Sequence, residues 1–110
     1  MFEIRGEDLY LTRGDSGEFT VSVREENGAE LILEETDALV FTAGVKEVKL
    51  VKQADDEGRF VFLPEDTKTL LPGTYEYDIR LHRAEGSVYT VVGRTPERTP
   101  HLVLLQEAGE

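Results

Sequence analysis

The segment "TYEYDIRLHR" (74–83) restricts the fold more than any other part of the sequence, because its side chains alternate strictly between two faces. A repeat of two residues is that of a β-strand. One apolar and one polar face are typical of an antiparallel sheet with one side in water. The apolar face carries Tyr75, Tyr77, Ile79 and Leu81, and the polar face carries Glu76, Asp78, Arg80 and His82.

Several other segments have the composition of short strands and are separated by turn residues such as Gly, Pro, Asn and Asp. Gly44 interrupts this series and predicts a bulge or bend. A short helical turn is expected near residues 64–70, because Pro64 suits the first helical position and Pro72 would end the helix. Strands are predicted at 8–12, 18–25, 31–33, 38–43, 47–53, 59–63, 74–83, 87–92 and 101–106.

About eight short strands with regular turn signals predict an all-β fold in a single domain, residues 1–110. The expected architecture is an antiparallel β-sandwich of immunoglobulin-like type, and a closed barrel of similar size is the alternative. The residues expected to support the fold are Phe19, Val21, Val23, Phe41, Phe60, Phe62, Tyr75, Tyr77, Ile79, Leu81, Val88 and Leu104.

The charge balance bears on the partners of the chain. It has 23 acidic and 12 basic residues, which gives a net charge of −11, and no basic cluster offsets the excess. Phosphate backbones and anionic membrane surfaces would repel such a chain, so neither nucleic acid nor membrane is an expected partner. The start, "MFEIRGEDLYL", lacks the basic and apolar regions of a signal peptide. There is no cysteine, which excludes disulfides and thiolate sites.

Residues 13–16 read "RGDS", the tetrapeptide by which many adhesion proteins bind animal integrins. Adhesion would need Arg13 and Asp15 at the tip of an exposed, mobile loop. A hairpin turn between the strands at 8–12 and 18–25 explains the same residues. Gly14 and Gly17 can adopt positive φ there, and the Asp15 side chain can bond to backbone two residues on. We prefer the structural turn.

No motif of a catalytic, cofactor or metal site is present, so the chain is not expected to be an enzyme. His82 and His101 are expected to be surface residues. The acidic runs at 25–26, 34–37 and 55–58 lack the alternating spacing of a calcium loop. A hydrolase built from two carboxylates that meet in space remains a third interpretation.

The tyrosines are the side chains in this sequence that could form a patch on which a ligand stacks. Tyr75 and Tyr77 occupy the apolar phase of their strand, which favours core packing, and Tyr89 follows in a later strand. The chain has no tryptophan. A binding module for carbohydrate or a host-surface receptor, which would use these tyrosines or the RGDS turn, is therefore the alternative function.

An ordered series of motifs resembles the small β-sandwich modules of bacteriophage and prophage tail and baseplate proteins, such as the N-terminal module of Gram-positive phage baseplate upper proteins. The motifs are "LYLTRGDSGEFTVSV" (9–23), "ENGAELILEETDALVFTA" (26–43), "GRFVFLPEDTKTLLPGTYEYDIRL" (58–81) and "HRAEGSVYTVVGR" (82–94), and the segment 44–57 matches less closely. The most specific part places Thr67, Leu70, Gly73, Tyr75, Tyr77 and Asp78 in the family's arrangement.

The resemblance implies a non-catalytic structural protein of a phage tail or baseplate. The implied partners are further copies of the chain and other phage structural proteins. It also implies synthesis in the bacterial cytoplasm and a final place in the virion. The expected contact loops are Arg13–Gly17 and Thr95–Pro100, and the named contact residues are Arg13, Gly14, Asp15, Thr95 and Arg98.

Overall fold

The computed structural model describes residues 2–24, 28–29, 31, 36–44 and 48–107. These residues form short strands and a single 3-10 turn, which confirms an all-β fold. The predicted strand at 31–33 lies largely outside the described residues. The elements are β1 (Phe2–Arg5), β2 (Asp8–Thr12), β3 (Gly17–Thr20), β4 (Ala38–Gly44), β5 (Lys49–Gln53), β6 (Arg59–Phe62), η1 (Pro64–Asp66), β7 (Gly73–His82), β8 (Val88–Val92) and β9 (His101–Leu105).

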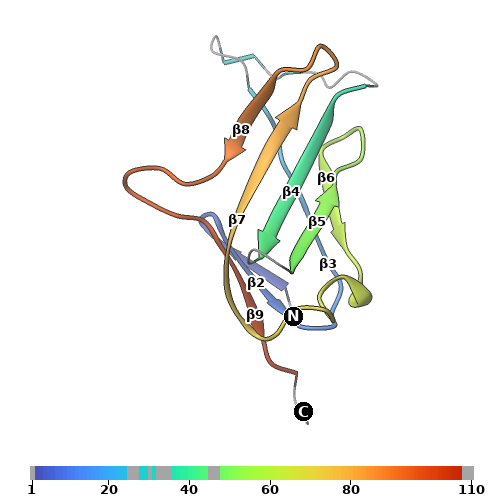
Figure 1. The fold of residues 1–110 in the computed structure, drawn as a ribbon, viewed down its shortest axis with the longest axis vertical. Helices are drawn as coiled ribbons and strands as arrows, with labels where there is room; N and C mark the ends of the chain where they lie inside the picture. The colour runs from blue at the N-terminus through green and yellow to red at the C-terminus, as the bar shows by residue number, and fades with distance from the viewer. Residues whose placement is uncertain (1, 25–27, 30, 32–35, 45–47, 108–110) are drawn as a thin grey trace.

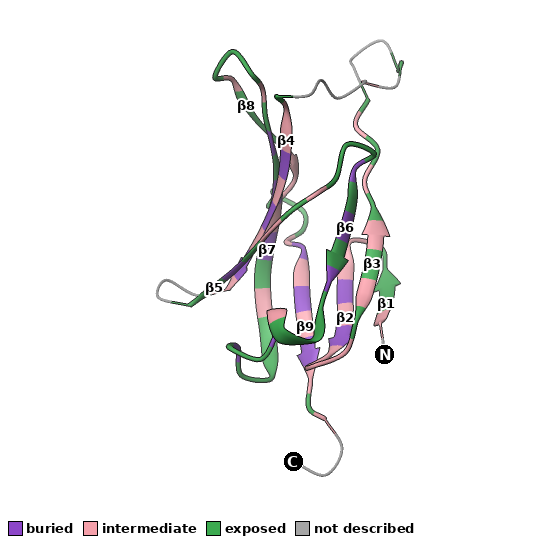
Figure 2. Cartoon of the chain, turned by 90° about the vertical axis from the view of Figure 1, so that its right-hand side faces the viewer, coloured by how far each residue is buried: buried purple, intermediate pink, exposed green. Residues whose placement is uncertain are grey.

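The strands form a mixed sheet of seven strands and a separate pair. The large sheet has the order β1-β2-β9-β7-β4-β5, with β8 paired to β7, and the small sheet consists of β3 and β6 (Figure 1). In Figure 2, β4, β5 and β8 lie on one side of the molecule, and β1, β2, β3 and β6 lie on the other. The two sheets share no ladder in the described residues, so the predicted alternative of a closed barrel is not formed there.

The long strand β7 connects the two sides of the molecule. Its first half, Gly73–Glu76, pairs with β9, and its second half, from Tyr77 onwards, pairs with β4. The end of the strand also pairs with β8, with a register shift between Ile79 and Arg80. The segment that alternates most strictly in the sequence is therefore the central strand of the large sheet.

One strand pair departs from the predicted antiparallel arrangement. β2 and β9 run parallel, with Leu9 opposite Leu102 and Leu11 opposite Leu104. All other strand pairs of the described residues are antiparallel. The prediction of a wholly antiparallel sheet is wrong here because alternation reveals one buried face but not the direction of the neighbouring strand.

The predicted hairpin around the RGDS segment is also wrong. β2 lies between β1 and β9 in the large sheet, whereas β3 pairs with β6 in the small sheet. Residues 13–16 therefore carry the chain from one sheet to the other. The N-terminal strand β1 was not predicted, and it pairs with β2 through a turn in which Gly6 has φ of 64°.

An aromatic cluster fills the space between the two sheets. Phe19 of β3 stacks on Phe60 of β6 at 5.1 Å between ring centroids. Phe41 of β4 lies 5.3 Å from Phe62 across the interface and 5.0 Å from Tyr77 of the neighbouring strand β7, measured between ring centroids. Aromatic pairs at such distances stabilise a core beyond the area that they bury. This cluster holds the small sheet against β4 and β7.

Most of the residues predicted to support the fold lie in or against this core. Phe41, Phe60, Phe62, Tyr77, Ile79, Leu81 and Leu104 are buried, and Phe19, Val21, Val23 and Tyr75 pack against the core. The prediction for Val88 is wrong. Val88 lies opposite His82 in the ladder, on the outer face, and is 48% exposed. Buried core residues that the prediction did not include are Leu9, Leu11, Leu39, Ala43, Leu50, Leu70 and Leu102.

The predicted helical turn near 64–70 is present as the 3-10 turn Pro64–Asp66. The Asp66 carboxylate accepts a hydrogen bond of 2.6 Å from the Leu63 amide and forms an ion pair of 2.9 Å with Lys52. The turn therefore begins at Pro64 with its first free amide satisfied. Among the described residues, no helix is long and apolar enough to cross a membrane.

Candidate functional site

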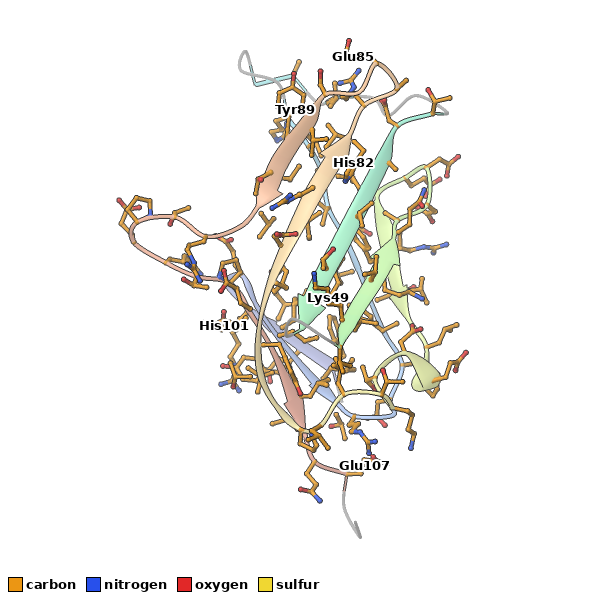
Figure 3. All side chains as sticks on the ribbon, in the orientation of Figure 1. Lys49, His82, Glu85, Tyr89, His101 and Glu107 are labelled. Carbon is orange, nitrogen blue, oxygen red and sulfur yellow. The ribbon has the colours of Figure 1, made fainter. Side chains whose placement is uncertain are left out.

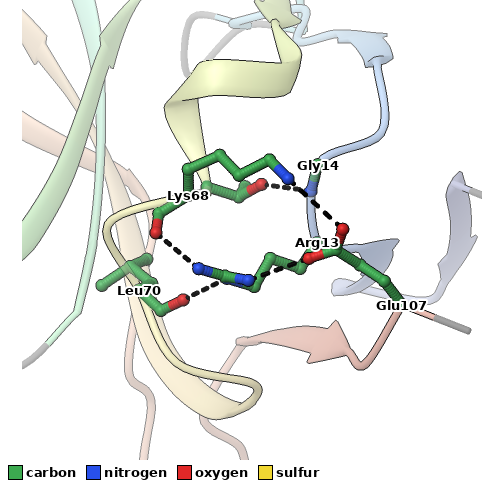
Figure 4. A network of polar contacts seen from close by, with 6 residues as sticks. Arg13, Gly14, Lys68, Leu70 and Glu107 are labelled. Carbon is green, nitrogen blue, oxygen red and sulfur yellow. Dashed lines mark hydrogen bonds and ion pairs between the residues drawn. The ribbon is translucent and has the colours of Figure 1, made fainter. Parts of the chain in front are cut away.

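The RGDS segment is the first candidate, and the structure shows where its arginine points. The Arg13 guanidinium donates hydrogen bonds to the carbonyl oxygens of Leu70, at 2.8 Å, and Lys68, at 2.7 Å (Figure 4). It also forms an ion pair of 2.8 Å with Glu107. Arg13 thus joins the end of β2, the connection before β7 and the end of β9. These contacts are structural.

The two glycines of this segment have different roles. Gly14 has φ of 86°, and its amide donates a hydrogen bond of 2.8 Å to the hydroxyl of the fully buried Thr67. Gly17 does not need positive φ, contrary to the prediction. A Cβ at Gly17 would lie 2.8 Å from the Phe2 ring, so glycine is required there by packing. Both glycines serve the fold.

The second predicted contact loop, Thr95–Pro100, is held by its own bonds. Thr95 and Arg98 exchange backbone hydrogen bonds of 2.8 and 3.3 Å. Arg98 approaches Glu7 at 3.7 Å, just before β2, whereas Arg13 lies just after β2. A strand of five residues spans roughly 17 Å. The two predicted loops are therefore at opposite ends of β2 and do not form one site.

Tyr77 has the largest pKa shift of the described side chains. Its hydroxyl donates a hydrogen bond to the Glu7 carbonyl, and its side chain is 4% exposed. Burial, with smaller contributions from the nearby Glu7 and Asp8 carboxylates and an opposing one from Arg98, raises the pKa of Tyr77 to about 12. A phenol with such a high pKa stays protonated and acts as a hydrogen-bond donor, not as a base.

Tyr75 at the start of β7 also uses its hydroxyl within the chain. It donates a hydrogen bond of 2.5 Å to the carbonyl of Leu71, four residues earlier. Since both tyrosines bond to backbone, neither is an open stacking platform. Tyr89 differs, because it lies on β8 and is 56% exposed.

The two histidines lie apart on the surface. His82 is exposed at the end of β7, and His101 begins β9, as Figure 3 shows. The His101 ring is 3.9 Å from the Asp8 carboxylate, which also accepts the His101 amide at 3.1 Å. No group of three or more metal-ligating side chains converges within the described part of the chain.

The acidic turn at 55–58 is stabilised from within. The Asp55 carboxylate accepts amide hydrogen bonds of 2.9 Å from both Glu57 and Arg59, and the Arg59 side chain pairs with it at 3.2 Å. The backbone hydrogen bond from Arg59 is the largest cause of a lowered Asp55 pKa. Of the other acidic runs, residues 25–26 and 34–35 lie outside the described residues, and Asp37 pairs with Arg83 at 3.3 Å.

Two shallow depressions lie on the outer face of β4, β7 and β8. The larger has a volume of about 360 Å³ and contains Glu76 and Asp78. Each of these carboxylates is paired, Glu76 with Arg94 at 2.5 Å and Asp78 with Arg80 at 3.5 Å. The smaller, of about 190 Å³, extends from these carboxylates to Lys49. The paired charges make this face polar and give it little net charge.

The edges of the large sheet are the remaining candidate surface. β1 and β5 end the sheet, and β8 pairs only with β7 in the described residues. β1 carries Glu3 and Arg5, and β5 carries Lys49 and Lys52, whereas β8 carries no charged residue. Charged side chains on edge strands prevent unwanted pairing, so an uncharged edge is unusual. Among the described strands, one edge of β8 is unpaired because of the strand order, and local sequence patterns do not reveal that order.

Comparison with protein-family models, with curated proteins and with solved structures finds no match for this chain.

Proposed function

We propose that this chain is a non-catalytic assembly protein of a bacteriophage or prophage tail or baseplate, which acts through protein–protein contacts. The observation that carries the proposal is the set of three strand edges, β1, β5 and β8, that the described part of the large sheet leaves unpaired. Unpaired strand edges present rows of amides and carbonyls that another chain can extend. The net charge of −11 would keep free subunits soluble and direct them to a more basic partner.

An immunoglobulin-like sandwich is part of this proposal. In that fold, strands B and E pair in one sheet and strands C, F and G belong to the other. The pair β3–β6 and the group β4, β7 and β9 follow the same order along the chain. The bond from Tyr75 to the Leu71 carbonyl has the position of the tyrosine corner, at the turn into strand F. These features support an interaction module of a common structural type.

The RGDS segment fits the proposal as a structural turn. The resemblance places this turn between two strands of the phage modules, and here Arg13 bonds to the Leu70 carbonyl and to Glu107. Such contacts account for the arginine without a receptor. The proposed final location is the virion, after synthesis in the bacterial cytoplasm.

The alternative, a binding module for carbohydrate or a host-surface receptor, has one observation in its favour. The depression of about 360 Å³ near Glu76 and Arg94 is polar. The residues first suggested for ligand contact, Arg13 and the buried Tyr77, are instead engaged by backbone carbonyls. Screening the isolated protein on a glycan array tests this function. Glycan binding that is lost in Glu76→Gln would favour it.

Immunogold labelling of phage particles tests the main proposal. An antibody against the purified protein is applied to particles that the encoding bacterium releases after prophage induction. We expect gold at the tail or baseplate and none with an antibody against an unrelated cytoplasmic protein. Particles without label, together with recovery of all the protein in the soluble fraction, would contradict the proposal.

A further inference from the structure

The edge strand β8 stands out among the strands of the described residues that lack Asp, Glu, Lys and Arg. These strands are β4, β8 and β9. β4 and β9 are hydrogen-bonded on both sides, whereas β8 is bonded on one side only. Figure 1 shows β8 at the outer edge of its layer. Its side chains include Val88, 48% exposed, and Tyr89, 56% exposed. An uncharged edge with exposed apolar side chains is suited to strand addition.

The hydrogen-bond pattern defines which groups face outward. The Arg83 amide bonds to the Ser87 carbonyl at 2.8 Å, which makes 83 and 87 a hydrogen-bonded pair. Bonded and non-bonded pairs alternate along an antiparallel ladder. Tyr89, opposite Leu81, therefore bonds toward β7, and the amides and carbonyls of Val88 and Thr90 point away from it. The register shift lies beyond Thr90, so this stretch of the edge is regular.

We infer that β8 pairs with β8 of a second copy of this chain, antiparallel, about a two-fold axis at Tyr89. In this register Val88 of each copy lies opposite Thr90 of the other. The two outward amides and two outward carbonyls of each strand then meet, which forms four backbone hydrogen bonds. Tyr89 of one copy lies opposite Tyr89 of the other in a non-hydrogen-bonded pair, the kind of pair in which side chains approach most closely.

Charge complementarity favours a second copy as the partner. A two-fold axis brings each residue near its own equivalent, so a charge on the strand would oppose a like charge. β8 has none. At the ends of the strand, Glu85 lies in the turn before β8 and Arg94 follows β8 (Figure 3 labels Glu85 and Tyr89). The antiparallel register places Glu85 of one copy opposite Gly93 of the other, twice, and so next to Arg94, which also pairs with Glu76 of its own chain. By the same rule, self-pairing of β5 would bring lysines together.

Cysteine cross-linking tests the position of the axis, because the natural chain has no cysteine. In Tyr89→Cys the two thiols would face each other in a non-hydrogen-bonded pair, where the spacing suits a disulfide. Val51→Cys on the opposite edge is the matched control, since Val51 and Tyr89 are both 56% exposed. Under mild oxidation we expect a covalent dimer from Tyr89→Cys and mainly monomer from Val51→Cys.

A proline substitution tests the hydrogen bonds. Thr90→Pro removes an amide that points away from β7, so the fold should tolerate it, while two of the four intermolecular bonds are lost. Val51→Pro removes an equivalent outward amide of β5, since the bond from Ala54 to the Leu39 carbonyl sets the alternation there. Light scattering should show that Thr90→Pro loses the dimer and Val51→Pro keeps it. If Thr90→Pro alters the circular dichroism spectrum, Tyr89→Lys, which opposes two charges at the axis, replaces it.

The inference rests on the proposed function in treating the chain as an assembly subunit, and the outcomes separate the two. A dimer that Thr90→Pro or Tyr89→Lys does not weaken would overturn β8 pairing and leave the assembly function intact. A wild-type monomer at every concentration, with equal cross-linking of Tyr89→Cys and Val51→Cys, would also overturn it. The edge would then accept an extended segment of another protein, and particle labelling would decide the assembly function.

Discussion

At the residue scale, side chains that look functional in the sequence are used to connect distant segments. Arg13 is the clearest case, because it bonds to backbone carbonyls more than 50 positions away in the sequence and to Glu107. Its side chain is only 23% exposed. A guanidinium that satisfies two carbonyls and one carboxylate restricts three segments at once.

Arg13→Ala should therefore destabilise the protein by about 2 kcal/mol, because two carbonyl groups and Glu107 lose a charged donor. Urea unfolding followed by circular dichroism measures the difference. Arg80→Ala is the control, since Arg80 is 53% exposed and pairs at 3.5 Å, and its cost should stay within about 0.5 kcal/mol. Equal costs for the two variants would refute the structural role of Arg13.

Tyr77 leads to a prediction at alkaline pH. Its pKa is raised from 10.0 to about 12, so the folded state binds the phenolic proton more tightly than the unfolded state. The stabilisation is therefore complete below pH 10 and is lost as the pH rises toward 12. Thermal unfolding over this range should show a falling midpoint, with a smaller fall in Tyr77→Phe. An identical pH dependence in both proteins would contradict the raised pKa.

At the element scale, the connection from η1 into β7 depends on a few side-chain bonds. Tyr75→Phe removes the hydroxyl that bonds to the Leu71 carbonyl and should cost about 1 kcal/mol. Tyr89→Phe, which changes an exposed hydroxyl on β8, should have almost no effect on the unfolding of the monomer. Both are measured by urea unfolding at low protein concentration. A cost of Tyr75→Phe no larger than that of Tyr89→Phe would contradict a role of the Tyr75 hydroxyl in this connection.

The turn between β5 and β6 should respond to acid through Asp55. The Asp55 pKa is lowered mainly by the Arg59 amide, so the stabilisation is present above the unfolded pKa of 3.8 and is lost as the pH falls through the lower folded value. Asp55→Asn should be less stable than the wild type at neutral pH, with a difference that shrinks in acid. Asp56→Asn, one residue on, makes the same charge change and should show no such convergence.

Strand patterns allowed much of the element layout to be predicted, and the reasons for the failures are physical. β7 alternates over ten residues with one buried face, so its position and phase follow from the sequence. β8 has apolar side chains in both phases, so its sequence did not determine whether Val88 or Tyr89 faces inward. β1 has only four residues next to a glycine turn. The parallel pairing of β2 with β9 depends on residues about 90 positions apart, which no local pattern encodes.

The candidate site depended even more on tertiary structure. The sequence identified the RGDS segment and the Thr95–Pro100 loop, but not that Arg13 bonds across the fold or that Thr95 and Arg98 bond to each other. The open edge of β8 was not predictable, because it exists only once β9 has taken the place beside the first half of β7. Whether a strand lies at the edge of a sheet depends on which strands its neighbours pair with.

At the scale of the whole molecule, net charge should control self-association. Two copies with a charge of −11 each repel one another over a Debye length of about 30 Å at 0.01 M salt, but only about 8 Å at 0.15 M. Dimerisation should therefore strengthen as salt rises over this range, as light scattering at several protein concentrations would show. Steady weakening with salt would mean that the Glu85–Arg94 pairs hold the dimer, not the strand ladder.

The position of β9 also affects the order of folding. β9 lies between β2 and β7, so the hairpin of β1 and β2 cannot join the large sheet until residues 101–105 have been synthesised. During translation, β2 would expose the side of the strand that later bonds to β9, together with the apolar residues Leu9 and Leu11. Pairing between distant segments closes large loops and is slow. The nascent chain is therefore most vulnerable to aggregation at its N-terminal hairpin, and a chaperone that binds there would act before the last strand emerges.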